Sequence, residues 1–176
     1  MNKFALAVAL AAITTTPVLA DTYTVTVTNT LAEELLAPIV VTGAANDSHF
    51  FEGDYVTPAA EEQVLTGDPG MVVASIGEGN AAVGHGMAGP PGVLLPAGES
   101  ITFDVETDAT SLRIFAMVAP TMVPDNYVSN VVDVHGVDET TVMLSRFDIG
   151  HDEGTMSTMQ ISEGAASVTI SRHGAM

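Results

Sequence analysis

Hydrophobic and polar residues alternate along much of this chain, a pattern typical of β-strands with one buried face. The clearest stretch lies near residue 21, where Tyr23, Val25 and Val27 alternate with threonines. It predicts a strand with one apolar and one hydroxyl-bearing face. Alternation or a short apolar run predicts further strands at 38–42, 71–76, 101–106, 112–118, 127–134, 140–144 and 167–171. About eight short strands are therefore expected.

One segment carries the sequence features of a helix start. Thr57 can cap the helix, Pro58 occupies the first helical position, and Glu61 and Glu62 fall in the first turn. The helix is expected to end by Gly67. Many strands, turn clusters rich in Gly, Pro, Asp and Asn, and a single short helix in a loop predict an all-β, antiparallel β-sandwich. We expect one domain, spanning residues 21–176.

The first twenty residues have the composition of a signal peptide. Lys3 begins a short charged start, residues 4–13 form an apolar run, and a small-residue end follows at Val18-Leu19-Ala20. The mature chain is expected to begin at Asp21. No segment approaches the ~20 apolar residues of a membrane-spanning helix. The sequence therefore predicts an exported protein without a membrane span, either periplasmic or secreted.

Acidic residues dominate the charge of the chain. There are 22 Asp and Glu against four Lys and Arg, and loss of Lys3 with the signal peptide leaves Arg113, Arg146 and Arg172, a net charge of −19 with neutral His. Such a surface repels nucleic acid and anionic lipid and attracts divalent cations or basic partners. Adaptation to a salty habitat explains the bulk charge equally well. Because cysteine is absent, disulfides, thiolate metal sites and blue-copper centres are excluded.

Three other motifs have weaker support in the sequence. Residues 72–82 contain a GxGxxA pattern, but the glycine- and proline-rich residues 84–92 cannot form the helix that a dinucleotide site requires, so a loop is expected. His85 and Met87 suit copper, although the other histidines are scattered. Neither a GxSxG elbow nor an HExxH motif is present. We therefore expect no enzyme.

The stretch RFDIGHDEGT, residues 146–155, holds three carboxylates and a histidine within six residues. Asp148, Asp152 and Glu153 repel one another when they are close, so the loop requires a cation, a cationic partner or exposure to water. Carboxylate oxygens, with backbone carbonyls and water, are the ligands that Ca²⁺ prefers. A solvated acidic loop without an ion is the alternative interpretation.

Taken with residues 116–128, this stretch resembles the spondin N-terminal domain family. In that family a strand ends in a Met-x-x-Pro-(Ser/Thr) loop with an Asp before an aromatic residue, and a later strand ends in aromatic-Asp-Ala-Gly-Thr-Asp. Here Met117, Pro120 and Thr121 precede Asp125 and Tyr127, and residues 147–152 match the later motif. Residues 23–41 and 90–105 are similar to the family's first strand and its Pro-Gly loop.

The resemblance implies a C2-like β-sandwich with a calcium ion at one end, bound by Asp125, Asp148 and Asp152. Glu153 and the carbonyl oxygens around Gly150 are secondary candidates, and His151 is expected to take no part because imidazole is a poor ligand for hard cations. The chain departs from the family pattern at Ile149 and His151, which replace Ala and Thr, and at residues 122–124, which lengthen the first loop.

These observations predict an exported, calcium-binding, non-enzymatic binding or adhesion module whose partner is an extracellular or envelope protein or glycan. The alternative is a periplasmic copper-handling protein that uses Met and His ligands. An enzyme acting at the acidic loops is the third and least supported possibility.

Overall fold

The computed structural model describes residues 20–119 and 125–174. Within these residues, eleven strands and three short helices follow one another. They are β1 (Asp21–Asn29), β2 (Leu35–Leu36), β3 (Ile39–Gly43), the 3-10 helix η1 (Ala44–His49), β4 (Phe51–Glu52), β5 (Tyr55–Val56), α1 (Pro58–Thr66), α2 (Gly70–Ile76), β6 (Ala81–Gly84), β7 (Ser100–Thr107), β8 (Ser111–Ala119), β9 (Asn126–Asp133), β10 (Glu139–Asp148) and β11 (Met159–Arg172). The expected signal peptide falls almost entirely outside the described residues.

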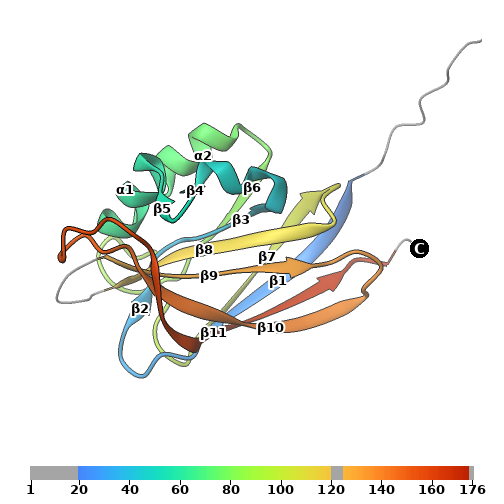
Figure 1. The fold of residues 1–176 in the computed structure, drawn as a ribbon. Helices are drawn as coiled ribbons and strands as arrows, with labels where there is room; N and C mark the ends of the chain where they lie inside the picture. Colours follow the sequence, from blue (N-terminus) through green and yellow to red (C-terminus); the bar gives the residue numbers. More distant parts are fainter. Residues whose placement is uncertain (1–19, 120–124, 175–176) are drawn as a thin grey trace, which may run out of the picture.

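Eight strands form one antiparallel sheet in the order β6-β3-β8-β9-β10-β11-β1-β7, and β2 pairs with β8 at its side. The sheet curves until it nearly closes (Figure 1), with the ring of Phe103 on β7 lying against Gly84 on β6. The predicted antiparallel β fold is therefore confirmed. Apart from β4 and β5, which pair only with each other, its strands form one continuous, strongly curved sheet, so the two layers of the expected sandwich are halves of the same sheet.

Alternation along the strands places the main core inside this curve. On β1, Tyr23, Val25 and Val27 are buried, while the threonines between them point to the other face. Side chains from β3, β7, β8, β10 and β11 join them in one hydrophobic cluster. Burial of such a face is the main source of stability for a sheet of this size.

A second core lies on the outer face of β3, β8 and β9, beneath the short helices (Figure 1). Phe50, Phe115 and Tyr127 are fully buried there, and the rings of Phe115 and Tyr127 stack with centroids 4.7 Å apart. The ring of Phe147 stacks in turn on Tyr127. This aromatic row runs from the helices to the ends of β9 and β10, where the acidic loop begins.

The predicted helix start is confirmed, whereas one predicted strand is wrong. Thr57 caps α1 by accepting a hydrogen bond from the Ala60 amide, and the helix ends at Gly67 with φ +79°. Residues 71–76, predicted as a strand, form most of α2 instead, so the fold has more than the single short helix expected. Val72 and Ile76 are buried one helical turn apart against the second core, which favours the helix. None of the described helices is long and apolar enough to cross a membrane.

Candidate metal centre

Strand register brings the two predicted acidic segments together. β9 begins directly after Asp125, β10 ends at Asp148, and the two strands pair so that Asn126 lies opposite Asp148. The amide of Ile149 then donates to the carbonyl oxygen of Asp125 across 3.0 Å. The backbone therefore places Asp125 beside Asp148, although 22 residues separate them in sequence.

Four carboxylates meet at this end of the sheet. We call Asp125, Asp148, Asp152 and Glu153 the acidic cluster; each offers an oxygen, and these oxygens all lie within 4.8 Å of one another. All three aspartates expected as metal ligands belong to it, as does the secondary candidate Glu153. Within residues 20–119 and 125–174, it is the only group of three or more His, Asp or Glu side chains close enough to share an ion.

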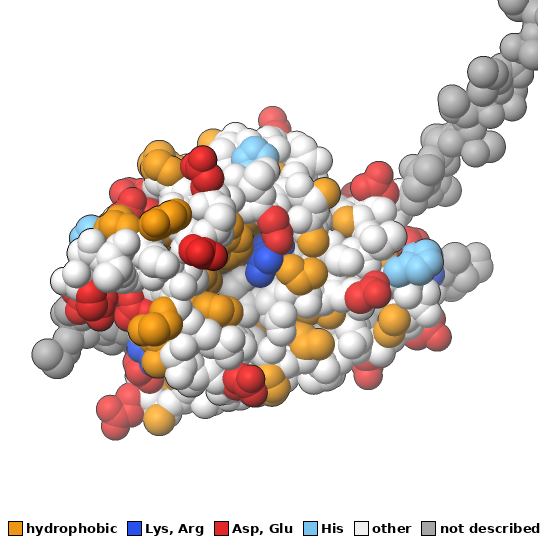
Figure 2. Space-filling view, in the orientation of Figure 1, with side chains coloured by type: hydrophobic (Ala, Val, Ile, Leu, Met, Phe, Trp, Pro, Cys, Tyr) orange, Lys and Arg blue, Asp and Glu red, His pale blue; other side chains and the backbone are white. Residues whose placement is uncertain are grey.

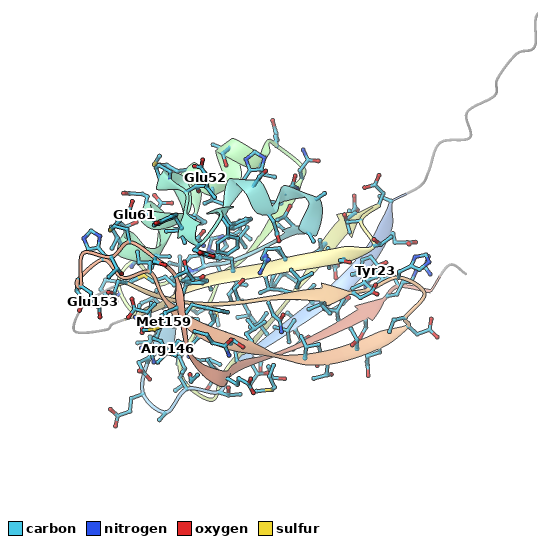
Figure 3. All side chains as sticks on the ribbon, viewed as in Figure 1. Tyr23, Glu52, Glu61, Arg146, Glu153 and Met159 are labelled. Atoms are coloured by element: carbon cyan, nitrogen blue, oxygen red, sulfur yellow. The ribbon has the colours of Figure 1, made fainter. Side chains whose placement is uncertain are left out.

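Burial differs sharply across the acidic cluster. Asp125 is only 2 % exposed, Asp148 is half-buried, and Asp152 and Glu153 lie at the surface. Figure 3 shows Glu153 on the outer edge of the β10–β11 loop. The cluster therefore has one buried carboxylate at its base and two exposed ones at its rim.

The buried carboxylate lacks part of its hydrogen bonding. Oδ1 of Asp125 accepts from Asn126 Nδ2 at 2.8 Å, whereas Oδ2 is buried without a hydrogen-bond partner among the described residues. Burial raises the pKa of Asp125, and the nearby charges of Asp148 and Asp152 raise it further. A buried, unpartnered carboxylate oxygen among other acids is the arrangement that a bound cation would satisfy.

The loop after β10 holds its shape through Gly150. This residue has φ +67°, a left-handed conformation that glycine adopts readily, and its amide donates to Asp148 Oδ1 at 2.6 Å. Its carbonyl oxygen accepts from the Met156 amide at 3.0 Å, which closes the loop. A Cβ on Gly150 would collide with Thr155 Oγ1 and crowd the Ser157 carbonyl. Ile149, by contrast, is fully buried in the second core.

An amide and an arginine support the acidic cluster without neutralising it. Asn126 Nδ2 also approaches Asp148 Oδ2 at 3.4 Å, and Arg146 Nε donates to Asn126 Oδ1 at 2.7 Å. Arg146 in turn pairs with Glu34 at 3.0 Å, which lowers the pKa of Glu34. In the part of the chain that the structure describes, no Lys or Arg forms an ion pair with the four clustered acids.

The two rim acids interact with each other. The hydrogen bond between their side chains lowers the pKa of Asp152 and raises that of Glu153. Two carboxyl groups this close share a proton more readily than they tolerate two charges. A divalent cation would remove that conflict, because it attracts both groups in their charged form.

The donor set suits a hard cation. All four side chains supply oxygen, which calcium and magnesium prefer over nitrogen and sulfur. His151 instead approaches α1, where its Nδ1 lies 3.4 Å from Oε1 of Glu61. Calcium accepts a flexible set of six to eight oxygens, so four carboxylates with loop carbonyls and water fit it better than the strict octahedron of magnesium.

The residues of the copper alternative lie elsewhere. His85 and Met87 are both exposed on the extended stretch after β6. Among the other histidines, His49 approaches Ser75 on α2, and His173 approaches Thr24 on β1. The structure therefore gives the copper alternative two neighbouring side chains, and no histidine among the described residues belongs to a group of three or more His, Asp or Glu side chains that could share an ion.

Sequence patterns did not predict the roles of Asn126, Arg146 and Glu34 at this centre. A run of acids is visible in one short segment, whereas Glu34 and Arg146 are 112 residues apart. Pro120 and Thr121 of the predicted loop motif, and the insertion at 122–124, lie outside the described residues. No model of a known protein family matches the chain, and no curated protein sequence matches it significantly. Membership of the spondin N-terminal domain family therefore stays a prediction.

Proposed function

We propose that this protein is an exported, calcium-stabilised, non-enzymatic binding or adhesion module of the spondin N-terminal domain type. The observation that carries the proposal is Asp125, a buried carboxylate with one oxygen left without a hydrogen bond, at the base of three further acids. Asp125, Asp148 and Asp152 would bind the ion, and Glu153 is the fourth side-chain candidate. The match of Asp125 and residues 147–152 to the family motifs supports the same assignment.

Calcium would supply the positive charge that the acidic cluster lacks. Asp125 belongs to the segment that enters β9, and the other three acids belong to the segment that leaves β10. An ion shared between them would hold the two segments together and offset their repulsion. Because the unfolded chain does not bring these segments together, binding favours the folded state.

The exposed rim suggests how a stabilising ion also serves binding. Asp152 and Glu153 lie at the surface, so a cation held from below by Asp125 would face solvent on the rim side. Carboxylate or hydroxyl oxygens of a protein or glycan partner can replace water on such an ion. The proposed partner is therefore an extracellular or envelope molecule that presents oxygen ligands.

The test is the melting temperature of residues 21–176 after EDTA treatment and again with added Ca²⁺ or Mg²⁺, at constant ionic strength. Ligand at 100 times its Kd stabilises a protein by about 2.7 kcal/mol, which corresponds to roughly 5–10 °C for a domain of this size. We expect a rise of this order with micromolar Ca²⁺, and none with Mg²⁺ at the same concentration.

Two substitutions make the test specific. Asp148→Asn should abolish the calcium response, because it removes a charge from the acidic cluster. Asp138→Asn is the matched control, since Asp138 is exposed just before the opposite end of β10. Loss of the response in both variants, or equal responses to Ca²⁺ and Mg²⁺ only at millimolar levels, would leave a solvated acidic loop as the better account.

Copper handling by His85 and Met87 remains the alternative proposal and makes the opposite prediction. Bound Cu²⁺ or Cu⁺ would then be lost in His85→Ala and retained in Asp148→Asn. Metal content measured after dialysis of both variants separates the two proposals directly.

A further inference from the structure

Sulfur is distributed unevenly between the core and the surface of this protein. Four methionines are exposed: Met71 at 54 %, Met87 at 93 %, Met143 at 45 % and Met159 at 64 %. Met117 is only 6 % exposed, and Met156 in the β10–β11 loop is half-buried. Among the described residues, the large hydrophobic side chains at the surface are these four methionines and only three others, Tyr55, Val131 and Ile161.

Leucine shows the opposite distribution. Every leucine among the described residues is buried or half-buried, and none is exposed. Leucine and methionine have similar volume and hydrophobicity and often replace each other in cores. A general tolerance of apolar groups at the surface would therefore expose both. The property that distinguishes the exposed methionines from the leucines is the thioether.

The thioethers are also the most easily oxidised groups in the chain, because it contains neither cysteine nor tryptophan. We propose that Met71, Met87, Met143 and Met159, here called the surface methionines, are sacrificial oxidation sites that consume hydroperoxides at the surface before the core is reached. This role goes beyond the proposed binding function and does not depend on calcium.

The chemistry at each site is a two-electron oxygen transfer. A lone pair on the methionine sulfur attacks the terminal oxygen of a hydroperoxide, a sulfur–oxygen bond forms, and the oxygen–oxygen bond breaks. The sulfur is oxidised to a sulfoxide, and the peroxide is reduced. The departing oxygen takes a proton and leaves as water or an alcohol.

The fold tolerates oxidation at the surface better than at Met117. A sulfoxide is polar, and on an exposed side chain its new dipole is solvated by water. Met117 instead packs against Ala37 and Ala119, and its Sδ lies beside Gly67, where α1 ends. An added oxygen there would separate α1 from β8.

The positions of the surface methionines fit scavenging better than metal binding. They lie on α2, on the stretch after β6, on β10 and on β11. A metal site requires donors that converge on one point, whereas a scavenging surface requires only that each sulfur be reachable. Dispersion also avoids a continuous apolar patch that would promote aggregation.

The test is oxidation of residues 21–176 with four molar equivalents of hydrogen peroxide in EDTA, followed by peptide mapping by mass spectrometry and by thermal melting. Sulfoxide should form at the surface methionines roughly tenfold faster than at Met117, in line with their exposures. The melting temperature of the oxidised protein should stay within about 2 °C of the starting value. Met156 is half-buried and should oxidise at an intermediate rate, whereas Met122 and Met176 lie outside the described residues and are mapped without an assigned expectation.

Two variants decide the role. A variant with all four surface methionines changed to leucine should accumulate several-fold more Met117 sulfoxide at the same peroxide dose. Its melting temperature should therefore fall after the peroxide treatment. Met117→Leu, which keeps all four surface methionines, should consume nearly as much peroxide as the wild type and should stay folded. Equal oxidation of Met117 and the surface methionines, unfolding of the oxidised wild type, or no added oxidation of Met117 in the four-leucine variant would each overturn the proposal.

Discussion

Asp125, the buried member of the acidic cluster, makes the stability of the metal-free protein depend on pH. Burial raises its pKa above the ordinary value, so the folded protein binds this proton more tightly than the unfolded chain does. Without metal, this residue therefore costs stability as the pH rises from about 4, the ordinary aspartate pKa, through its raised folded value. A bound cation reverses the cost, because it favours the charged carboxylate.

We expect Asp125→Asn to stabilise the metal-free protein at pH 7 and to remove its response to calcium. The amide removes a buried charge, and its oxygen can still accept from Asn126. A gain of about 1 kcal/mol corresponds to roughly 2–4 °C. Thermal melts in EDTA at pH 5 and pH 7 measure it, and the gain should shrink at pH 5, where wild-type Asp125 is more protonated. A variant that is less stable than the wild type at pH 7 in EDTA would contradict this account.

Tyr127 provides a spectroscopic probe of the same site. The chain has three tyrosines and no tryptophan, and Tyr127 is buried two residues from Asp125. We expect Tb³⁺, a luminescent substitute for Ca²⁺, to emit when tyrosine is excited and to be displaced by calcium. Tyr127→Phe should remove most of this emission, because energy transfer falls steeply with distance. The matched variant Tyr55→Phe, at an exposed ring on β5, should retain it. Equal emission from both variants would place the ion elsewhere.

At the scale of single residues, the sequence predicted the four members of the acidic cluster but not the groups that position them. Asp148, Asp152 and Glu153 are adjacent in one segment, and Asp125 was found by a motif, so all four could be named in advance. Asn126 supports two of them through hydrogen bonds that depend on the pairing of β9 with β10. The pair formed by Arg146 and Glu34 depends on the curvature of the whole sheet, which local patterns do not encode.

Among the elements, the β10–β11 loop contains two glycines that share a left-handed backbone conformation but differ in their surroundings. Gly150 and Gly154 both have positive φ, at +67° and +71°, so alanine is strained at either position. A Cβ at Gly150 meets Thr155 and the backbone of Ser157, whereas a Cβ at Gly154 meets nothing within 4 Å. Comparing the two positions therefore separates the cost of the left-handed conformation from the cost of disturbing the packed interior of the loop.

We expect Gly150→Ala to weaken calcium binding by at least tenfold, and Gly154→Ala to change it by less than threefold. Both variants should lose about 1–2 kcal/mol of folding free energy from the left-handed conformation. Gly150→Ala should lose more, because the loop that carries Asp148 and Asp152 must also shift. Calcium titration followed by melting temperature measures both effects. Equal calcium affinities in the two variants would show that the loop does not position the ligands.

The elements themselves were predictable where periodicity was strong. Alternation on β1 gave both the strand and its buried face, and Thr57 with Pro58 gave the start of α1. The apolar run 71–76 has no clear period, and its length suits a strand or two turns of helix equally. Asp68 decides the outcome locally, because its Oδ1 accepts from the Gly70 amide at the first turn of α2. The second core beneath α2 also favours the helix at residues 71–76. Because that core is assembled from distant segments, a local pattern cannot reveal it.

Across the whole molecule, the negative charge has few internal partners. The chain carries a net charge of −18, and acids are spread over the visible face in Figure 2. The arginines Arg113, Arg146 and Arg172 already pair with Asp47, Glu34 and Asp21. Most of the remaining acids therefore interact with one another through water, and their summed repulsion favours the expanded, unfolded chain.

We therefore expect sodium chloride to stabilise the metal-free protein. The Debye length falls from about 30 Å at 0.01 M to about 3 Å at 1 M, so repulsion between separated acids should vanish over this range, while the close pairs of the arginines lose little. The melting temperature in EDTA should rise by roughly 5 °C or more. Potassium chloride serves as the control for ion identity, because screening depends only on ionic strength.

Calcium and salt should therefore stabilise the folded protein by two separate effects. Micromolar calcium barely changes the ionic strength, so its stabilisation comes from the acidic cluster alone, whereas molar salt acts on every exposed acid. Asp148→Asn should therefore lose the calcium response and keep nearly all of the salt response. If the variant lost both together, the acidic cluster would be the main source of repulsion in the molecule. If the wild type melted at a lower temperature in high salt, its surface ion pairs would outweigh the repulsion among its acids.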